Sequence, residues 1–148
     1  MRSTSFKSLA TVVALVAAVA CSDNTSPSSQ FAGGSYALQT INASTLPYTY
    51  SSGSGTVTIQ SDTYTLNNDG TYSETINETI SNGFGSSPAS DAEAGTWSQN
   101  GNAVVFMPTY STQGSYAQYT GALSGSSTFS HSSLTFSYNG VVWVYNHT

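Results

Sequence analysis

The two residues whose types and spacing most favour chemistry are Glu74 and Glu78. They alternate with Tyr72, Ile76 and Ile80, so that every second position of this segment is apolar or acidic. Alternate side chains of a β-strand share a face, so a strand here would place both carboxylates on its apolar face. Such a face predicts a partly hydrated ligand cavity lined by two acids. A β-bulge that reverses the alternation, or a strand that extends past the core, would instead leave an acid in water.

Catalytic and metal-binding patterns are poorly represented in the chain. Four residues along a strand separate the Cα atoms of Glu74 and Glu78 by about 13 Å, whereas glycosidase carboxyl pairs lie about 5 to 9.5 Å apart. His131 and His147 are isolated, and the chain has a single cysteine, so no metal-ligand spacing occurs. We therefore expect no catalytic residue, no metal and no cofactor, with an envelope hydrolase as the least favoured alternative.

Three aromatic residues complete the candidate site. Phe84 lies between two glycines in the segment 81–92, which is rich in Ser and Gly and is predicted to be a weakly structured loop at the mouth of the domain. Trp97 and Trp143 either line an apolar pocket or fill the core, because buried aromatic residues dominate small cores. The candidate ligand-binding residues are Tyr72, Glu74, Ile76, Glu78, Phe84, Trp97 and Trp143.

The elements that must position these side chains are strands. Apolar residues recur with a period of two, and no helical period follows Cys21. The predicted strands cover residues 35–41, 56–60, 63–66, 71–80, 95–99, 103–107, 116–123, 133–138 and 141–145. Asn-Gly and Asp-Gly pairs at 69–70, 100–101 and 139–140 predict hairpin turns. The fold class is therefore all-β: an antiparallel up-and-down meander of about 8–9 strands that closes into a barrel, with a β-sandwich as the alternative.

The N-terminus has the parts of an export signal. Arg2 and Lys7 precede the apolar run 9–20, which ends in Ala-Val-Ala immediately before Cys21. This end resembles the lipobox of bacterial lipoproteins, which implies acylation of Cys21 and an anchor in the cell envelope, at the outer membrane because Ser22 is not acidic. Cleavage that leaves a free thiol is the alternative. We expect a signal peptide at 1–20, a lipidated flexible tether at 21–32 and one domain at 33–148.

The charge balance excludes one class of function. The chain has seven acidic residues and two basic ones, Arg2 and Lys7, so no Lys or Arg follows the export signal. Nucleic-acid binding depends on basic side chains that neutralise phosphates, so we exclude this class of partner. Ion pairs to Lys or Arg are equally impossible in the domain. Its fold must therefore rely on apolar burial and backbone hydrogen bonds.

Several turn and strand motifs resemble a known family. The motifs are Gly34-Ser-Tyr36, Leu46-Pro-Tyr48, Asp69-Gly-Thr-Tyr72, Gly95-Thr-Trp97 and Tyr138-Asn-Gly140. Together they resemble the small lipocalin-like domains of bacterial lipoproteins over roughly residues 31–147. The resemblance implies a β-barrel that binds a small apolar ligand, in a family whose function is usually unassigned. True lipocalins have Trp at the position of Tyr36 and an Arg near the last strand, which this chain lacks.

Two functional hypotheses follow. The first is a membrane-anchored, non-enzymatic barrel that binds a small apolar or neutral ligand. The second is a structural or interaction module of the envelope with a filled core and no ligand. An interior cavity of about 300 Å³ or more would favour the first hypothesis.

Overall fold

The computed structural model describes residues 33–124 and 133–148, and the regular secondary structure of this part of the chain consists of strands. The strands are β1 (Gly34–Ile41), β2 (Ser44–Thr45), β3 (Tyr48–Ser52), β4 (Gly55–Leu66), β5 (Thr71–Asn82), β6 (Gly85–Asn100), β7 (Ala103–Ser111), β8 (Tyr119–Ser124), β9 (Ser133–Tyr138) and β10 (Val141–His147). No helix of the described residues is long and apolar enough to span a membrane. The predicted signal peptide, lipidated Cys21 and tether, together with His131, lie outside the described residues.

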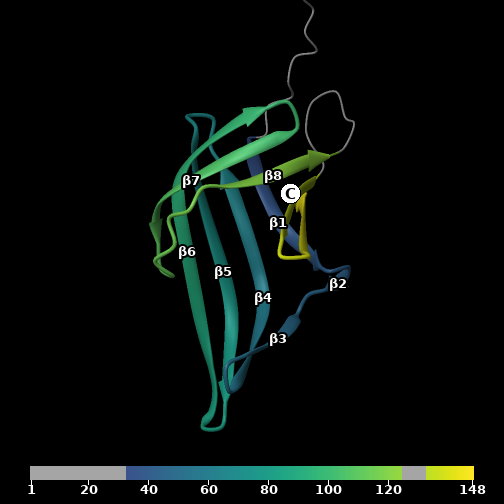
Figure 1. Cartoon of the computed structure of the whole chain (residues 1–148), viewed down its shortest axis with the longest axis vertical. Coiled ribbons are helices and arrows are strands. Elements are labelled where there is room, and N and C mark those ends of the chain that lie inside the picture. The colour runs from purple at the N-terminus through teal and green to yellow at the C-terminus, as the bar shows by residue number, and fades with distance from the viewer. Residues whose placement is uncertain (1–32, 125–132) are drawn as a thin grey trace, which may run out of the picture.

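Eight of the strands close into an antiparallel up-and-down barrel. Consecutive strands from β4 to β10 pair with one another, β10 pairs with β1, and β1 pairs with β4 to complete the circle. The short β2 pairs with β1, and β3 pairs with β4, so both are additions to the barrel (Figure 1). The predicted barrel is confirmed. The register of β1 against β4, from Gly34 opposite Leu66 to Ala37 opposite Thr63, excludes the sandwich alternative.

The strands differ greatly in length. The strands β4, β5 and β6 contain 12, 12 and 16 residues, whereas β7 to β10 contain six to nine. In Figure 1 the three long strands run down most of the view, while β7 and β8 cross only its upper half. The barrel therefore has one end where all eight strands meet and another end dominated by the long β4–β6 wall.

The segment 81–92 is not the weakly structured loop that the sequence predicts. The strands β5 and β6 continue through it as a hairpin, with Ser81 opposite Ser86 and Asn82 opposite Gly85. Asn82 Oδ1 accepts a hydrogen bond from the Phe84 N–H at 2.9 Å and stabilises the turn. The hydrogen bonds between β5 and β6 join backbone groups. The two strands can therefore pair past the core, where their side chains do not alternate between apolar and polar.

The packed core occupies the end where the strands meet. Its members share inward positions and less than a tenth of their surface is exposed: Tyr36, Leu38, Ile41, Tyr64, Leu66, Tyr72, Trp97, Val104, Phe106, Leu123, Leu134 and Tyr145. Trp97 Nε1 donates to the carbonyl oxygen of Asn67 at 3.0 Å, which satisfies the polar atom of the indole. The turn at 139–140 has φ of 50° and 78°, as the Asn-Gly pair predicts.

A bulge in β4 decides which side chains enter the barrel. The register against β5 shifts between Ile59 and Ser61, so Gln60 is an extra residue. Ile59 faces inward before the bulge, and Asp62 and Tyr64 face inward after it. The predicted strands 56–60 and 63–66 are therefore one bulged strand. The extra residue changes the inward-facing positions of β4 from odd-numbered to even-numbered residues, and this brings an acidic side chain, Asp62, into the interior.

Candidate functional site

A large cavity lies in the barrel beside the packed core. Its volume is about 800 Å³, and a smaller hollow of about 260 Å³ adjoins it and shares Tyr64, Glu74, Ile76 and Tyr119. The long strands β4 and β5 provide one wall. The other sides come from β8, β9 and β10 and from the 113–118 segment between β7 and β8. A barrel of eight strands can fill with side chains or hold a small ligand, and here the interior is open.

The residues predicted from the sequence are divided between the cavity, the core and the surface. Glu74, Ile76, Glu78 and Trp143 line the cavity. Tyr72 and Trp97 are buried in the packed core. Phe84 is fully exposed at the tip of the β5–β6 hairpin, away from the cavity lining. The structure thus brings together four of the seven candidates, and β5 keeps the regular alternation that directs both glutamates inward.

Three further acidic residues face the same space. Asp62 on β4 lines the large cavity, and Asp91 and Glu93 on β6 line the adjoining hollow. The strand register aligns them, with Glu74 directly opposite Glu93, and with Asp62 and Asp91 on either side of Ile76. Like charges opposite one another destabilise a sheet, so this arrangement needs an explanation beyond folding.

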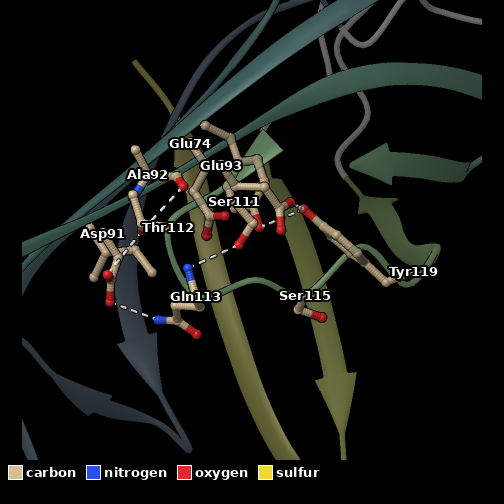
Figure 2. Close-up of a pocket in the computed structure, with 11 residues that line it drawn as sticks. Glu74, Asp91, Ala92, Glu93, Ser111, Thr112, Gln113, Ser115 and Tyr119 are labelled. Atoms are coloured by element: carbon tan, nitrogen blue, oxygen red, sulfur yellow. Dashed lines mark hydrogen bonds between the residues drawn. The ribbon is translucent and has the colours of Figure 1, made fainter. Parts of the chain in front are cut away.

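Glu93 is held by a group of tyrosines. Its Oε1 accepts hydrogen bonds from the hydroxyls of Tyr72 at 2.6 Å and Tyr119 at 2.5 Å. The hydroxyls of Tyr119 and Tyr64 lie 3.1 Å apart and extend this network. Burial, followed by the hydrogen bond to Glu93, raises the pKa of both Tyr72 and Tyr119. These hydroxyls therefore remain protonated and act as donors to the carboxylate. Figure 2 shows Tyr119 directed at Glu93, with Glu74 beside it.

Asp62 is the most deeply buried acidic residue of the described part. Only 5% of its surface is exposed. Its Oδ2 accepts a hydrogen bond from the Tyr145 hydroxyl at 2.6 Å, whereas its Oδ1 has no hydrogen-bond partner. Burial raises the pKa of Asp62 to about 7, and hydrogen bonds from the Tyr145 hydroxyl and the Thr63 backbone oppose part of that rise. Asp62 therefore changes charge near neutral pH.

Glu74 and Glu78 differ in their surroundings. Burial, followed by repulsion from Asp62, raises the pKa of Glu74 to about 8. Burial and repulsion from Asp91 also raise the pKa of Glu78, which lies further along β5 toward the hairpin tip. At neutral pH the inner pair, Asp62 and Glu74, is partly protonated. A positive charge placed nearby would favour the ionised forms of both.

The 113–118 segment is tied to β6 through Asp91. Gln113 Nε2 donates to Asp91 Oδ2 at 2.7 Å, and Thr112 Oγ1 donates to Asp91 Oδ1 at 3.0 Å. The Thr112 N–H also donates to the carbonyl of Ala92 at 2.9 Å (Figure 2). These contacts hold the start of the segment against the long wall, so this side of the cavity is defined by ordered hydrogen bonds.

Aromatic side chains form the boundary between the core and the cavity. Phe106 stacks on Tyr119 with ring centroids 5.1 Å apart, and the edge-to-face pair of Phe106 and Tyr72 has centroids 5.0 Å apart. The ring centroid of Phe136 lies 5.2 Å from that of Tyr64 and 5.6 Å from that of Tyr145. The cavity side of this boundary presents aromatic rings, and Ile59 and Trp143 add apolar surface further out.

No family model matches the chain, no curated protein matches it, and no solved structure matches it at a significant level. The eight-stranded antiparallel up-and-down barrel is consistent with a lipocalin-like fold.

Proposed function

We propose that this protein binds a small molecule inside its barrel and performs no chemistry on it. The observation that carries the proposal is the cavity of about 800 Å³. Ligand sites occupy about 300 to 1,000 Å³, so this cavity lies within the range for a small molecule. A structural module with a filled core is the alternative, and an open interior of this size disfavours it.

The lining indicates that part of the ligand is apolar. Ile59, Trp143 and Phe136 face the cavity together with the tyrosines. Tyr50 and Tyr138 also line it, and each has more than a third of its surface exposed, which places them at the entrance. Binding sites combine such apolar walls with a few polar groups that orient the ligand. A hydrocarbon or aromatic body would replace water against these walls.

A lipid on Cys21 completes the proposal. The lipobox-like sequence and the barrel fold together support a lipocalin-like lipoprotein of the bacterial cell envelope, at the outer membrane, with the tether 21–32 between anchor and barrel. Metabolic labelling with a palmitate analogue tests this part. The native chain should incorporate label and the Cys21→Ser variant should not. A native protein that lacks label and reacts through a free thiol would contradict the anchor.

Binding itself is tested with a neutral fluorescent probe, N-phenyl-1-naphthylamine. Its emission should rise when it enters the barrel, and Ile76→Trp, which fills the space shared by the two hollows, should reduce that rise by about tenfold or more. Phe84→Ser is the matched control outside the cavity. Equal binding by the native protein and Ile76→Trp would contradict a site in the barrel.

The native ligand is sought by native mass spectrometry of the protein purified from its host. A discrete additional mass that Ile76→Trp does not retain would support a carrier. If the protein carries no additional mass and does not bind the probe, the structural module becomes the favoured function. Turnover in a hydrolase screen that disappears in Glu74→Gln and Glu93→Gln would overturn the non-enzymatic assignment.

A further inference from the structure

We propose that the ligand is an amphiphilic organic cation, whose charged group lies between the carboxylates of β4, β5 and β6 and whose apolar body lies against the aromatic walls. This inference rests on the proposed binding function and narrows it. The sequence alone favoured an apolar or neutral ligand. The distribution of charge around the cavity changes that expectation.

The cavity concentrates negative charge that the chain does not balance. Five of the seven acidic residues of the protein line the cavity or the adjoining hollow: Asp62, Glu74, Glu78, Asp91 and Glu93. No Lys or Arg follows Lys7. His147 packs its ring against Tyr36 in the packed core, with centroids 5.2 Å apart, and is not part of the lining. A cationic ligand would supply the counter-charge that the described side chains lack.

The position of Asp62 indicates where the positive charge of the ligand would bind. It is more than nine-tenths buried, it lines the cavity, and its Oδ1 lacks a hydrogen-bond partner. A buried polar atom without a partner destabilises a fold, so it is expected where a ligand supplies the missing interaction. Tyr145 occupies the other oxygen and holds the carboxyl group in place. An N–H donor or a quaternary ammonium group in the cavity would complete the environment of Oδ1.

The aromatic rings fit the same ligand. Tyr64, Tyr145, Phe136 and Trp143 all line the cavity that contains Asp62. The faces of such rings attract ammonium groups, and desolvated sites strengthen this attraction. A carboxylate or phosphate ligand would instead face five acids, and a neutral apolar ligand would leave Oδ1 of Asp62 without a partner.

The spacing of the acids suits an organic cation better than a metal ion. Asp62 and Asp91 lie two strands apart, which is about 10 Å, and Glu78 is four residues beyond Glu74. Among the residues that the structure describes, no three or more His, Cys, Asp or Glu side chains are grouped closely enough to hold a metal. The cavity volume also far exceeds what a single ion fills.

Four octyl compounds with different head groups test the inference by isothermal titration calorimetry on the purified protein. At pH 9, octyltrimethylammonium should bind at least about tenfold more tightly than octanol, and octanoate should bind most weakly. Octylphosphocholine adds a phosphate to the same cation and should also bind more weakly than octyltrimethylammonium, which distinguishes a free cation from a zwitterionic lipid head group.

The pH dependence of binding reports on the protein alone, because octyltrimethylammonium is charged at every pH. The raised pKa values of Asp62 and Glu74 mean that both acids are more protonated at pH 6 than at pH 9. Glu78 shifts in the same direction, and Tyr64, Tyr119 and Tyr145, the tyrosines nearby, remain neutral with raised pKa values. The affinity should therefore rise by about tenfold or more from pH 6 to pH 9.

The double variant Asp62→Asn, Glu74→Gln should lose about tenfold or more in affinity for octyltrimethylammonium and lose most of the pH dependence. Asp69→Asn is the matched control, because Asp69 lies in the β4–β5 turn and caps Thr71 outside the cavity. The pH comparison on the native protein needs no variant, so a folding defect in the double variant would not remove the test.

The outcomes separate this inference from the proposed function. The cationic-ligand proposal is overturned if octanol, octanoate or octylphosphocholine binds as tightly as octyltrimethylammonium. It is also overturned if the affinity for octyltrimethylammonium is independent of pH. In both cases the barrel remains a binding protein. The same holds if N-phenyl-1-naphthylamine binds and none of the octyl compounds does. Absence of binding by every probe would overturn both proposals.

Discussion

The two ends of the barrel carry different side chains at the inward positions of the same strands. Along β5, the inward side chains change from Tyr72 in the packed core to Glu74 and then Glu78 beside the cavity. Along β4 they change from Leu66 to Asp62. One end is closed by aromatic and aliphatic packing, whereas the other keeps open space and carboxyl groups.

This difference shows that strand parity and packing are separate properties. Alternation determines which side chains face inward. Whether they are packed depends on how many strands surround them, and the short β8 and β9 strands do not extend along the whole β4–β6 wall. The packed end supplies apolar stabilisation, and this allows the other end to hold buried acids that destabilise the fold.

The largest predicted effect lies at the packed end. Phe106→Ala removes a fully buried ring that contacts four other aromatic residues, and it should lower the free energy of unfolding by about 3 to 5 kcal/mol. Ile76→Ala is the matched change at the cavity end and should cost about 1 kcal/mol, because this half-buried side chain borders open space. Urea unfolding measures both values. Equal losses would mean that the two ends are packed alike.

The second prediction concerns the acids at the cavity end. Their folded-state pKa values, about 7 for Asp62 and about 8 for Glu74, exceed the ordinary values of 3.8 and 4.5. The folded state therefore binds more protons than the unfolded state over the intervening pH range, so stability is greatest at the acidic side and falls as pH rises through 7 to 8. The midpoint of thermal unfolding without ligand should be lower at pH 9 than at pH 5 by at least about 5 °C.

Neutral replacements test the origin of that pH dependence. Asp62→Asn with Glu74→Gln should flatten the curve between pH 5 and pH 9 and raise the thermal midpoint at pH 9. Hydrogen bonds from Thr71 lower the pKa of Asp69 from its ordinary value of 3.8, so the stability that Asp69 contributes is lost only at pH values below this range. A protein whose stability increases from pH 5 to pH 9 would show that the two carboxyl groups are ionised without strain.

A smaller loss is expected where the two regions meet. Tyr145→Phe keeps the ring in the core but removes the donor to Asp62 Oδ2. The free energy of unfolding at pH 7 should fall by about 1 to 3 kcal/mol, because the buried Oδ2 then loses the Tyr145 donor. Tyr116→Phe, at an exposed position, is the control for the loss of a hydroxyl. An unchanged stability in Tyr145→Phe would indicate that Asp62 is hydrated.

The smallest effect is predicted at Phe84, which belongs to neither region. Its side chain is fully exposed at the β5–β6 turn. Phe84→Ser should change the free energy of unfolding by less than about 0.5 kcal/mol and should leave probe affinity unchanged. A marked loss of affinity would extend the binding site to the hairpin tip.

Much of the barrel could be predicted because its local signals agree with one another. The Asn-Gly turns and the period of two specify hairpins. The alternation around Glu74 and Glu78 places both acids on the cavity face of β5, since β5 pairs with β6 without a register shift. Parity within a regular strand is a local property, so it can be read without knowledge of the partner strands.

The remaining acids were missed for two physical reasons. Asp62 follows the bulge at Gln60, where the sequence suggests a break between two strands; its shared parity with Tyr64 was the available signal. Asp91 and Glu93 lie on β6, where the extended strand has no apolar alternation because its inner face borders open space. Sheet pairing, which is a long-range property, brought them opposite β5.

The most direct measurement of the central claim is the ¹³C NMR titration of the side-chain carboxyl carbons, with and without octyltrimethylammonium. We predict that Asp62 and Glu74 both titrate well above their ordinary pKa values of 3.8 and 4.5 in the free protein. Both pKa values should fall by at least about one unit when the cation binds. Titration of both groups near pH 4 in the free protein, or pKa values unaffected by the cation, would contradict an acidic cavity built to receive a positive charge.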